Sequence, residues 1–123
     1  MPKLIYILED NDDIREILEL LLIGDHYDVA GFPDVSSFYQ GLEAQIPDTF
    51  ILDVMLPDGN GIDVCCKLKQ EESTRDIPVV MMSANYTSQQ MAELCSAEEF
   101  ISKPFDIADF SQRIANQLGE PMR

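Results

Sequence analysis

Three acidic residues and a lysine, each at the end of a short apolar run, are the best candidates for chemistry in this chain. Glu9 and Asp10 follow the first run, Asp53 ends a central one and Lys103 follows the last. A carboxylate at the end of a buried strand is costly unless a cation, a hydrogen bond or a proton compensates it. Carboxylates with room for phosphate oxygens suit Mg²⁺ or Mn²⁺, and a lysine can neutralise further phosphoryl charge.

This combination of groups predicts phosphoryl transfer. Asp53 is the preferred nucleophile because it is central and stands alone, while Glu9 and Asp10 would hold the metal ion. Lys103 would offset the remaining negative charge. Ser83, which ends a further apolar run, could donate a hydrogen bond to a phosphoryl oxygen.

The elements that must position these residues alternate between strands and helices. Strands are expected at the apolar runs without polar alternation, residues 3–8, 27–31, 50–52, 77–82 and 99–102. Helix starts are indicated by Asp13 with Glu16 as a capping box, Asp34, Gly61, Thr87 or Ser88, and Asp106, and helix ends by Gly24 and Gly119. Five β–α units predict an α/β fold, a flavodoxin-like doubly wound five-stranded parallel sheet of order 2-1-3-4-5 with five helices on its two faces.

Composition and charge limit the class of protein. The 123 residues suffice for one hydrophobic core, so residues 1–123 are expected to form a single domain. The net charge of −15, from 8 basic and 23 acidic residues, argues against direct binding to nucleic acid. No apolar stretch has the length of a membrane span, and the N-terminus does not fit a signal peptide. Three cysteines without disulfide or zinc-site spacing predict small core residues in a reducing cytoplasm.

The candidate residues also occur in the order of a known signalling family. The chain resembles a response-regulator receiver domain of two-component signal transduction, and is similar to stand-alone chemotaxis response regulators. The match covers essentially the whole chain. It rests on Glu9-Asp10, the stretch 53–61, Ser83-Ala84 and Lys103-Pro104-Phe105. Each motif alone is weak, but together and in register they are specific.

The resemblance implies how the acids would work. Asp53 would accept a phosphoryl group from a histidine kinase or a phosphotransfer protein. Asp10, Asp53 and the backbone carbonyl of Met55 would ligate Mg²⁺ or Mn²⁺. Glu9, which stands where Asp is commoner in the family, would act on the metal through water.

The resemblance also implies a switch. Ser83 and Lys103 would bind the phosphoryl oxygens, and the bond between Lys103 and Pro104 would be cis. Phe100 would be the aromatic switch residue, and without the hydroxyl of a tyrosine it would act through packing. An unidentified output partner, or the second copy in a weak homodimer of an otherwise monomeric domain, would bind the face formed by helix 88–94, strand 99–102 and helix 107–118.

Three other functions on this topology fit less well. A Mg²⁺-dependent aspartyl-phosphate phosphohydrolase usually has a second Asp two residues after the nucleophile, where this chain has Met55. A flavin-binding domain needs a phosphate loop of small residues, where the acids of 9–13 would repel the phosphate. A phosphorylation-independent receiver-like scaffold is the third alternative, although the acceptor, the acidic pair, the hydroxyl and the lysine are all present. The expected role is a cytoplasmic phosphoacceptor switch rather than an enzyme, and the sequence leaves open whether an output domain follows in the full-length protein.

Overall fold

Five parallel strands form the central sheet of the protein. The computed structural model describes residues 2–119, and the strands of the main sheet are β1 (Leu4–Leu8), β2 (Asp28–Phe32), β3 (Thr49–Asp53), β6 (Val79–Ser83) and β7 (Glu99–Ser102). Their order is β2-β1-β3-β6-β7, and every neighbouring pair is parallel. Counted along the chain, this is the predicted order 2-1-3-4-5, so the flavodoxin-like prediction is confirmed.

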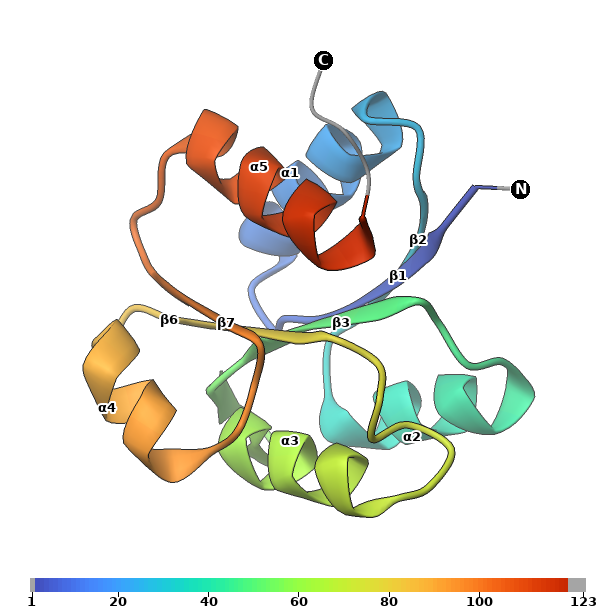
Figure 1. Cartoon of the computed structure of the whole chain (residues 1–123), viewed down its shortest axis with the longest axis vertical. Helices are drawn as coiled ribbons and strands as arrows, with labels where there is room; N and C mark the ends of the chain where they lie inside the picture. Colours follow the sequence, from blue (N-terminus) through green and yellow to red (C-terminus); the bar gives the residue numbers. More distant parts are fainter. Residues whose placement is uncertain (1, 120–123) are drawn as a thin grey trace.

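Helices cover both faces of the sheet. They are α1 (Asp12–Gly24), α2 (Val35–Ala44), α3 (Gly61–Gln70), α4 (Ser88–Leu94) and α5 (Ile107–Leu118). In Figure 1, α1 and α5 lie on one face, and α2, α3 and α4 lie on the other. Side chains of alternate strand residues point to opposite faces, so Ile5 and Ile7 pack under α1 and α5 while Tyr6 and Leu8 join the core on the opposite side.

The central strand β3 explains the uninterrupted apolar run that precedes Asp53. All five of its residues are buried, and it pairs with β1 on one side and β6 on the other. A parallel strand covered by helices on both faces has no solvent-facing side, so its sequence does not alternate with polar residues. Asp53 is its last residue and therefore reaches the edge of the sheet.

Four of the five strands of the main sheet, β1, β2, β3 and β6, differ by one or two residues from their predicted bounds. β2 runs one residue later than predicted, because the backbone N–H of Glu9 donates to the Phe32 carbonyl and brings that residue into the sheet. β6 begins at Val79, after Pro78, because proline has no N–H to donate to a strand ladder. The Pro78 carbonyl still accepts the N–H of Phe50 at 3.1 Å.

Most of the predicted helix caps are confirmed. Asp34, Thr87 and Asp106 each accept a backbone N–H of their helix, and Gly119 ends α5 in the left-handed conformation at φ 69°. The predicted capping box of Asp13 with Glu16 is wrong. Asn11 caps α1, since its Oδ1 accepts the N–H of Ile14 at 2.9 Å, and Asp13 lies inside the first turn.

The end of α1 also differs in detail from the prediction. Gly24 is the last helical residue, with Asp25 as the C-cap, and the left-handed backbone lies further on at His26, with φ 70°. His26 is exposed. No helix within residues 2–119 has the length and apolar character needed to cross a membrane.

A small hairpin that the sequence did not predict follows β3. It consists of β4 (Met55–Leu56) and β5 (Gly59–Asn60), which pair antiparallel. The Asp58 carboxylate at its turn accepts the N–H groups of Val35 (2.8 Å) and Ser36 (3.1 Å) at the start of α2. The hairpin is therefore attached to a neighbouring helix, and the chain that leaves Asp53 has a fixed course.

Candidate functional site

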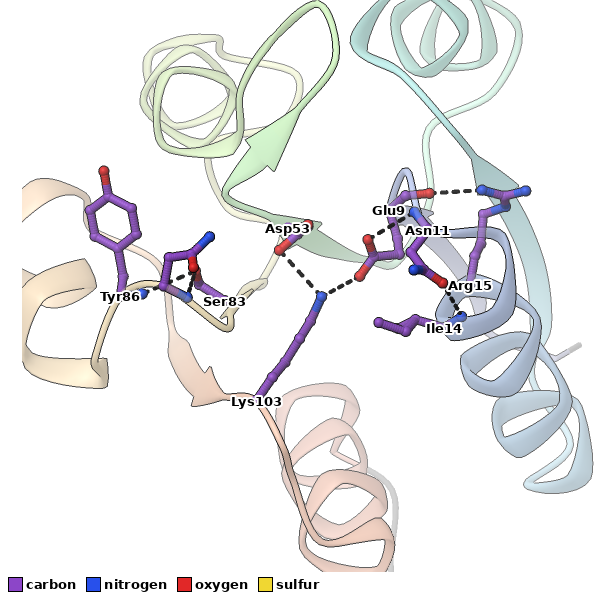
Figure 2. Close-up of polar contacts among 9 residues, drawn as sticks. Glu9, Asn11, Ile14, Arg15, Asp53, Ser83, Tyr86 and Lys103 are labelled. Carbon is purple, nitrogen blue, oxygen red and sulfur yellow. Dashed lines mark hydrogen bonds and ion pairs between the residues drawn. The ribbon is translucent and has the colours of Figure 1, made fainter.

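The predicted site residues come together at one edge of the sheet. Glu9 directly follows β1, Asp53 and Ser83 are the last residues of β3 and β6, and Lys103 directly follows β7. Because all these strands are parallel, their carboxyl ends share this edge. Figure 2 shows the Lys103 side chain reaching between Glu9 and Asp53, which confirms that these three residues converge.

Lys103 compensates the charge of two carboxylates. Its Nζ donates a hydrogen bond to Glu9 Oε1 and lies 3.4 Å from Asp53 Oδ1. The side chains of Lys103, Glu9 and Asp53 are only 12%, 3% and 10% exposed. Buried ion pairs of this kind are weakly screened by water, so removal of one partner leaves an uncompensated charge. The following peptide bond to Pro104 is cis, as the resemblance implies.

Backbone and side-chain contacts hold Glu9 in place. Its Oε2 accepts the N–H of Asn11 at 3.2 Å, while its other carboxylate oxygen accepts from Lys103. Arg15, on the first turns of α1, donates to the Glu9 carbonyl at 2.9 Å and pairs with Asp12 at 2.6 Å. Hydrogen bonds to both its carboxylate and its backbone carbonyl therefore hold Glu9 in place, although its side chain is longer than that of an aspartate.

A cluster of carboxylates at this edge has the donor atoms for a divalent cation. Glu9, Asp10 and Asp53 each offer an oxygen, and these oxygens lie within 4.8 Å of one another. Glu9 and Asp53 are buried, and Asp10 is exposed, so the cluster opens to solvent on one side. Hard oxygen ligands with an open side suit a cation that keeps some of its water. The residues present therefore fit divalent-metal binding.

The environment of Asp53 favours its protonated form when no cation is bound. Burial, followed by the negative charge of Glu9, raises the pKa of Asp53 to about 6, and the opposing effect of the Lys103 ammonium is smaller. A bound divalent cation would favour the ionised carboxylate. Asp53 is therefore a weaker acid than an ordinary aspartate, and added positive charge would shift it further toward the ionised form.

Gly61 fixes the chain next to Asp53, and the sequence analysis identified it only as a helix start. A Cβ at this position would lie 1.9 Å from the backbone oxygen of Asp53. The Gly61 N–H also donates to the Val54 carbonyl at 2.8 Å. Only glycine permits this approach, so the first residue of α3 sets the path of the loop that contains Met55. A glycine after a turn is common enough that the sequence alone could not reveal this contact.

Ser83 ends β6 at the same edge of the sheet, whereas Phe100 lies within β7, three residues before Lys103. The Ser83 oxygen accepts the N–H groups of Asn85 (3.0 Å) and Tyr86 (3.2 Å), so it stabilises the turn that leads to α4 (Figure 2). Phe100, in β7, is half-buried and packs against the core beneath α3 and α4. Its carbonyl accepts hydrogen bonds from Ser88 of α4 (3.2 Å) and Arg113 of α5 (3.1 Å).

The sequence matches one family over nearly the whole described structure. The model of the response regulator receiver domain family matches residues 5–115. The chain belongs to this family. A curated relative of the receiver domain is the transcriptional regulatory protein CseB of Streptomyces coelicolor, 36% identical over 109 residues. The match covers 87% of this chain and 45% of the relative, so this chain spans about half the length of the curated relatives it matches.

Solved structures show the same receiver-domain fold. The receiver domain of a signal transduction histidine kinase from Syntrophus aciditrophicus superposes with a TM-score of 0.88 and is 25% identical, covering 95% of this chain and 90% of that one. The receiver domain of the sensor histidine kinase PA1611 from Pseudomonas aeruginosa has a TM-score of 0.86 at 21% identity, covering 98% of this chain and all of that one. That second structure contains a magnesium ion coordinated in the active-site cleft.

Proposed function

We propose that this receiver domain takes a phosphoryl group onto Asp53 from a phosphohistidine of a histidine kinase or a phosphotransfer protein, and then binds a different set of partners. The observation that carries the proposal is the buried Asp53 carboxylate at the sheet edge, beside the Lys103 ammonium and the acids Glu9 and Asp10. A regulatory domain of this kind modifies itself and is not an enzyme that acts on external substrates.

In the proposed reaction, an Asp53 carboxylate oxygen attacks the phosphorus atom of phosphohistidine. The new bond is the O–P bond of an acyl phosphate, and the N–P bond breaks, so the imidazole leaves with its electron pair and takes up a proton from solvent. Asp53 must be ionised to attack. Lys103, 3.4 Å from Asp53 Oδ1, is near enough to offset the charge that the phosphoryl oxygens bring.

Mg²⁺ is the proposed cofactor, with Mn²⁺ as a substitute. Asp10, Asp53 and the Met55 carbonyl would hold it directly and Glu9 would act through water. When bound, the cation neutralises charge on the carboxylates and on the phosphoryl oxygens. The support is the spacing of the three carboxylates and the magnesium ion in the PA1611 receiver domain.

The proposed switch connects the site to the face formed by α4, β7 and α5. Ser83 and Lys103 follow neighbouring strands, and the Lys103 N–H donates to the Ser83 carbonyl at 2.9 Å. If Ser83 turns to a phosphoryl oxygen, it releases the N–H groups of Asn85 and Tyr86 before α4. The half-buried Phe100 can then repack between two states, a population shift that changes how an output partner or a second copy binds this face.

An apolar hollow of about 430 Å³ beside Lys103 is the proposed docking place for the phosphodonor. Its lining comes from the start of α1, the loop after β6 and the segment around Pro104, namely Ile14, Ile17, Ala84, Lys103, Pro104, Phe105 and Ile107. Ile17 and Ile107 are 50% and 55% exposed. Because Lys103 contributes to both the hollow and the acceptor site, a helical donor bound here would have its histidine close to Asp53.

The remaining parts of the proposal concern the whole chain. Residues 1–123 would act as one receiver unit in the cytoplasm, with no direct contact to nucleic acid or to a membrane. A phosphohydrolase is disfavoured because Met55, half-exposed, replaces the acid that would protonate a leaving group. A phosphorylation-independent scaffold is the alternative that the experiment must exclude.

The deciding experiment is intact mass spectrometry after incubation with acetyl phosphate and Mg²⁺, followed by the same assay with a phosphorylated kinase domain. Wild-type protein should gain one phosphoryl group, Asp53→Asn should gain none, and EDTA should abolish the gain. Asp10→Asn removes a charged ligand, so it should raise the Mg²⁺ concentration needed for half-maximal phosphorylation at least about tenfold. Asp13→Asn, which is exposed and outside the cluster, should leave that concentration unchanged. No gain from either donor would support the scaffold.

A further inference from the structure

The loop that carries Met55 is held at its base by backbone hydrogen bonds. The Val54 N–H donates to the Met82 carbonyl at 3.2 Å, and the Gly61 N–H donates to the Val54 carbonyl at 2.8 Å. Met55 itself pairs with Asn60, which is the N-cap of α3. The backbone next to Asp53 is therefore attached to β6 and to the start of α3.

The outer end of the same loop depends on Asp58. The hairpin has only two residues in each strand, and so short a hairpin has little stability of its own. The Asp58 carboxylate reaches α2, where Oδ1 accepts the N–H of Val35 at 2.8 Å and Oδ2 that of Ser36 at 3.1 Å. A Cβ on Gly59 would lie 3.1 Å from Cγ2 of Val35, so the turn also lies close against the helix. Because each carboxylate oxygen accepts one N–H, the two bonds fix both the position and the direction of the hairpin.

Asp58 is a second carboxylate at a helix start that already has a cap. Asp34 precedes α2, and its Oδ1 accepts the N–H of Ser37 at 2.8 Å. The N–H groups of Val35 and Ser36 are further donors without a partner inside the helix, and the positive end of the helix dipole favours a carboxylate there. Asp58 lies 23 and 22 residues further along the chain than these donors. Its contact therefore joins two separate segments on the α2–α3 side of the sheet (Figure 1).

Asp58 is near the carboxylate cluster in the chain but is not a member of it. Among residues 2–119, the carboxylate oxygens that gather within 4.8 Å of one another come from Glu9, Asp10 and Asp53. Both oxygens of Asp58 are occupied by α2 instead. Any effect of Asp58 on a cation in this cluster must therefore be transmitted by the loop.

We propose, on the basis of the proposed function, that Asp58 is a positioning residue for the divalent cation. By joining the hairpin to α2, it keeps the Met55 carbonyl, a proposed ligand, in a fixed place relative to Asp10 and Asp53. Mg²⁺ requires nearly octahedral coordination, whereas Ca²⁺ accepts more varied ligand geometry. Loss of the contact with α2 should therefore weaken the binding of Mg²⁺ more than that of Ca²⁺.

The test measures the dissociation constants of Mg²⁺ and of Ca²⁺ for the unphosphorylated full chain by NMR titration of its backbone amides. Asp58→Ala should raise the Kd of Mg²⁺ about tenfold and that of Ca²⁺ less than about threefold. This variant should still fold, because Asp58 is exposed and water can bind the N–H groups that it releases. Asp63→Asn, at an exposed position of α3, is the matched control for the lost charge and should change both constants by the same factor.

A second variant breaks the contact from the side of α2 without a change of charge. Val35→Pro removes the N–H that Asp58 Oδ1 accepts. Proline suits the first position of a helix, and Asp34 before it is already extended, with φ −150° and ψ 167°. The bond from Ser36 remains, so this variant should also weaken Mg²⁺ more than Ca²⁺, by a smaller factor than Asp58→Ala does.

Two results would overturn the positioning role while the proposed function stands. Equal loss of Mg²⁺ and Ca²⁺ affinity in Asp58→Ala would reduce the effect of Asp58 to its charge. Unchanged affinities in that variant would show that the hairpin keeps its course without the contact. A wild-type protein that bound neither cation, or an Asp10→Asn variant that bound both as tightly as wild type, would instead contradict the cation site of the proposed function, and the role of Asp58 with it.

Discussion

The Lys103 ammonium lies 3.4 Å from Oδ1 of Asp53, and both side chains are almost completely buried. The same ammonium hydrogen-bonds to Glu9, so a single positive charge is shared between two carboxylates. This compensation does not offset the effects of burial and of Glu9, which together raise the pKa of Asp53 to about 6. The site around Asp53 is thus short of positive charge, and its properties should depend on every change of charge near it.

Replacement of Lys103 should make Asp53 a weaker acid. Lys103→Met removes the charge that lowers the pKa of Asp53, so we expect that pKa to rise above about 6 by about one pH unit or more. The measurement is the pH titration of the Asp53 carboxyl carbon by NMR without divalent cations. Lys67→Met, at an exposed position of α3, is the matched control and should leave the titration unchanged. An unaltered Asp53 titration in Lys103→Met would contradict the shared-charge arrangement.

The stability of the metal-free protein should depend on pH through Asp53. Its pKa is higher in the folded protein, about 6, than in the unfolded chain, so folding binds a proton. The stabilisation from that proton is fully present below about pH 4 and is lost as the pH rises through about 6. Above about pH 7, Asp53→Asn should therefore raise the free energy of unfolding by about 1–3 kcal/mol.

The check is urea denaturation of wild type and Asp53→Asn across this pH range, in EDTA. The difference between the two proteins should grow with pH and level off above about pH 7. Asp76→Asn, in an exposed loop, is the control for loss of one negative charge anywhere in this acidic chain. If Asp76→Asn stabilised the protein as much as Asp53→Asn, the effect would be one of net charge and not of the site.

A single methyl group at Gly61 should disturb the chain at the end of β3. Gly61→Ala places a Cβ where the Asp53 backbone oxygen lies, at 1.9 Å, so the loop or α3 must move, at a cost of at least about 2 kcal/mol. Gly24→Ala, where nothing lies within 4 Å, should instead stabilise α1 by about 0.5–1 kcal/mol. Chemical denaturation of both variants gives the comparison. Equal effects of the two alanines would show that the loop adapts without cost.

A charge in the apolar hollow should slow phosphotransfer from a kinase domain but not uptake from acetyl phosphate. Ile17→Asp puts a carboxylate into the surface proposed to receive the kinase, so phosphotransfer from a phosphorylated kinase domain should slow at least about tenfold. Uptake from acetyl phosphate, which needs no docking surface, should be unchanged. Leu20→Asp, on the same helix, 64% exposed and outside the hollow, is the matched control. Equal slowing with both donors would mean that Ile17→Asp acts on the site itself.

The sequence predicted the parts of this molecule that follow from regular patterns. Strand β3 reads as a continuous apolar run because helices bury both of its faces, and the end of that run located Asp53. The convergence of Glu9, Asp53 and Lys103 then followed from parallel topology alone. Helix α3 begins at Gly61, the predicted helix start.

The parts that could not be predicted are of two kinds. Some depend on contacts between residues far apart in the sequence, and others on which of two neighbouring residues with the same capping ability caps a helix. Asn11 and Asp13 can both cap a helix, and only the backbone path decides that Asn11 does. The hairpin of β4 and β5 has two residues in each strand, too few for a periodic pattern. Asp58 accepts hydrogen bonds from backbone N–H groups 22 and 23 residues away, and no pattern in the sequence indicates this contact.

The hydrogen bond from Lys103 to Glu9 joins residues 94 positions apart. The ribosome therefore completes Asp53, the proposed acceptor, and the acids beside it long before it adds the lysine that offsets their charge. A nascent chain that ends before β7 has the Asp53 carboxylate without the ammonium that lies 3.4 Å from its Oδ1. Under the proposed function, we expect such a chain to be unable to take up a phosphoryl group until the last strand has been translated.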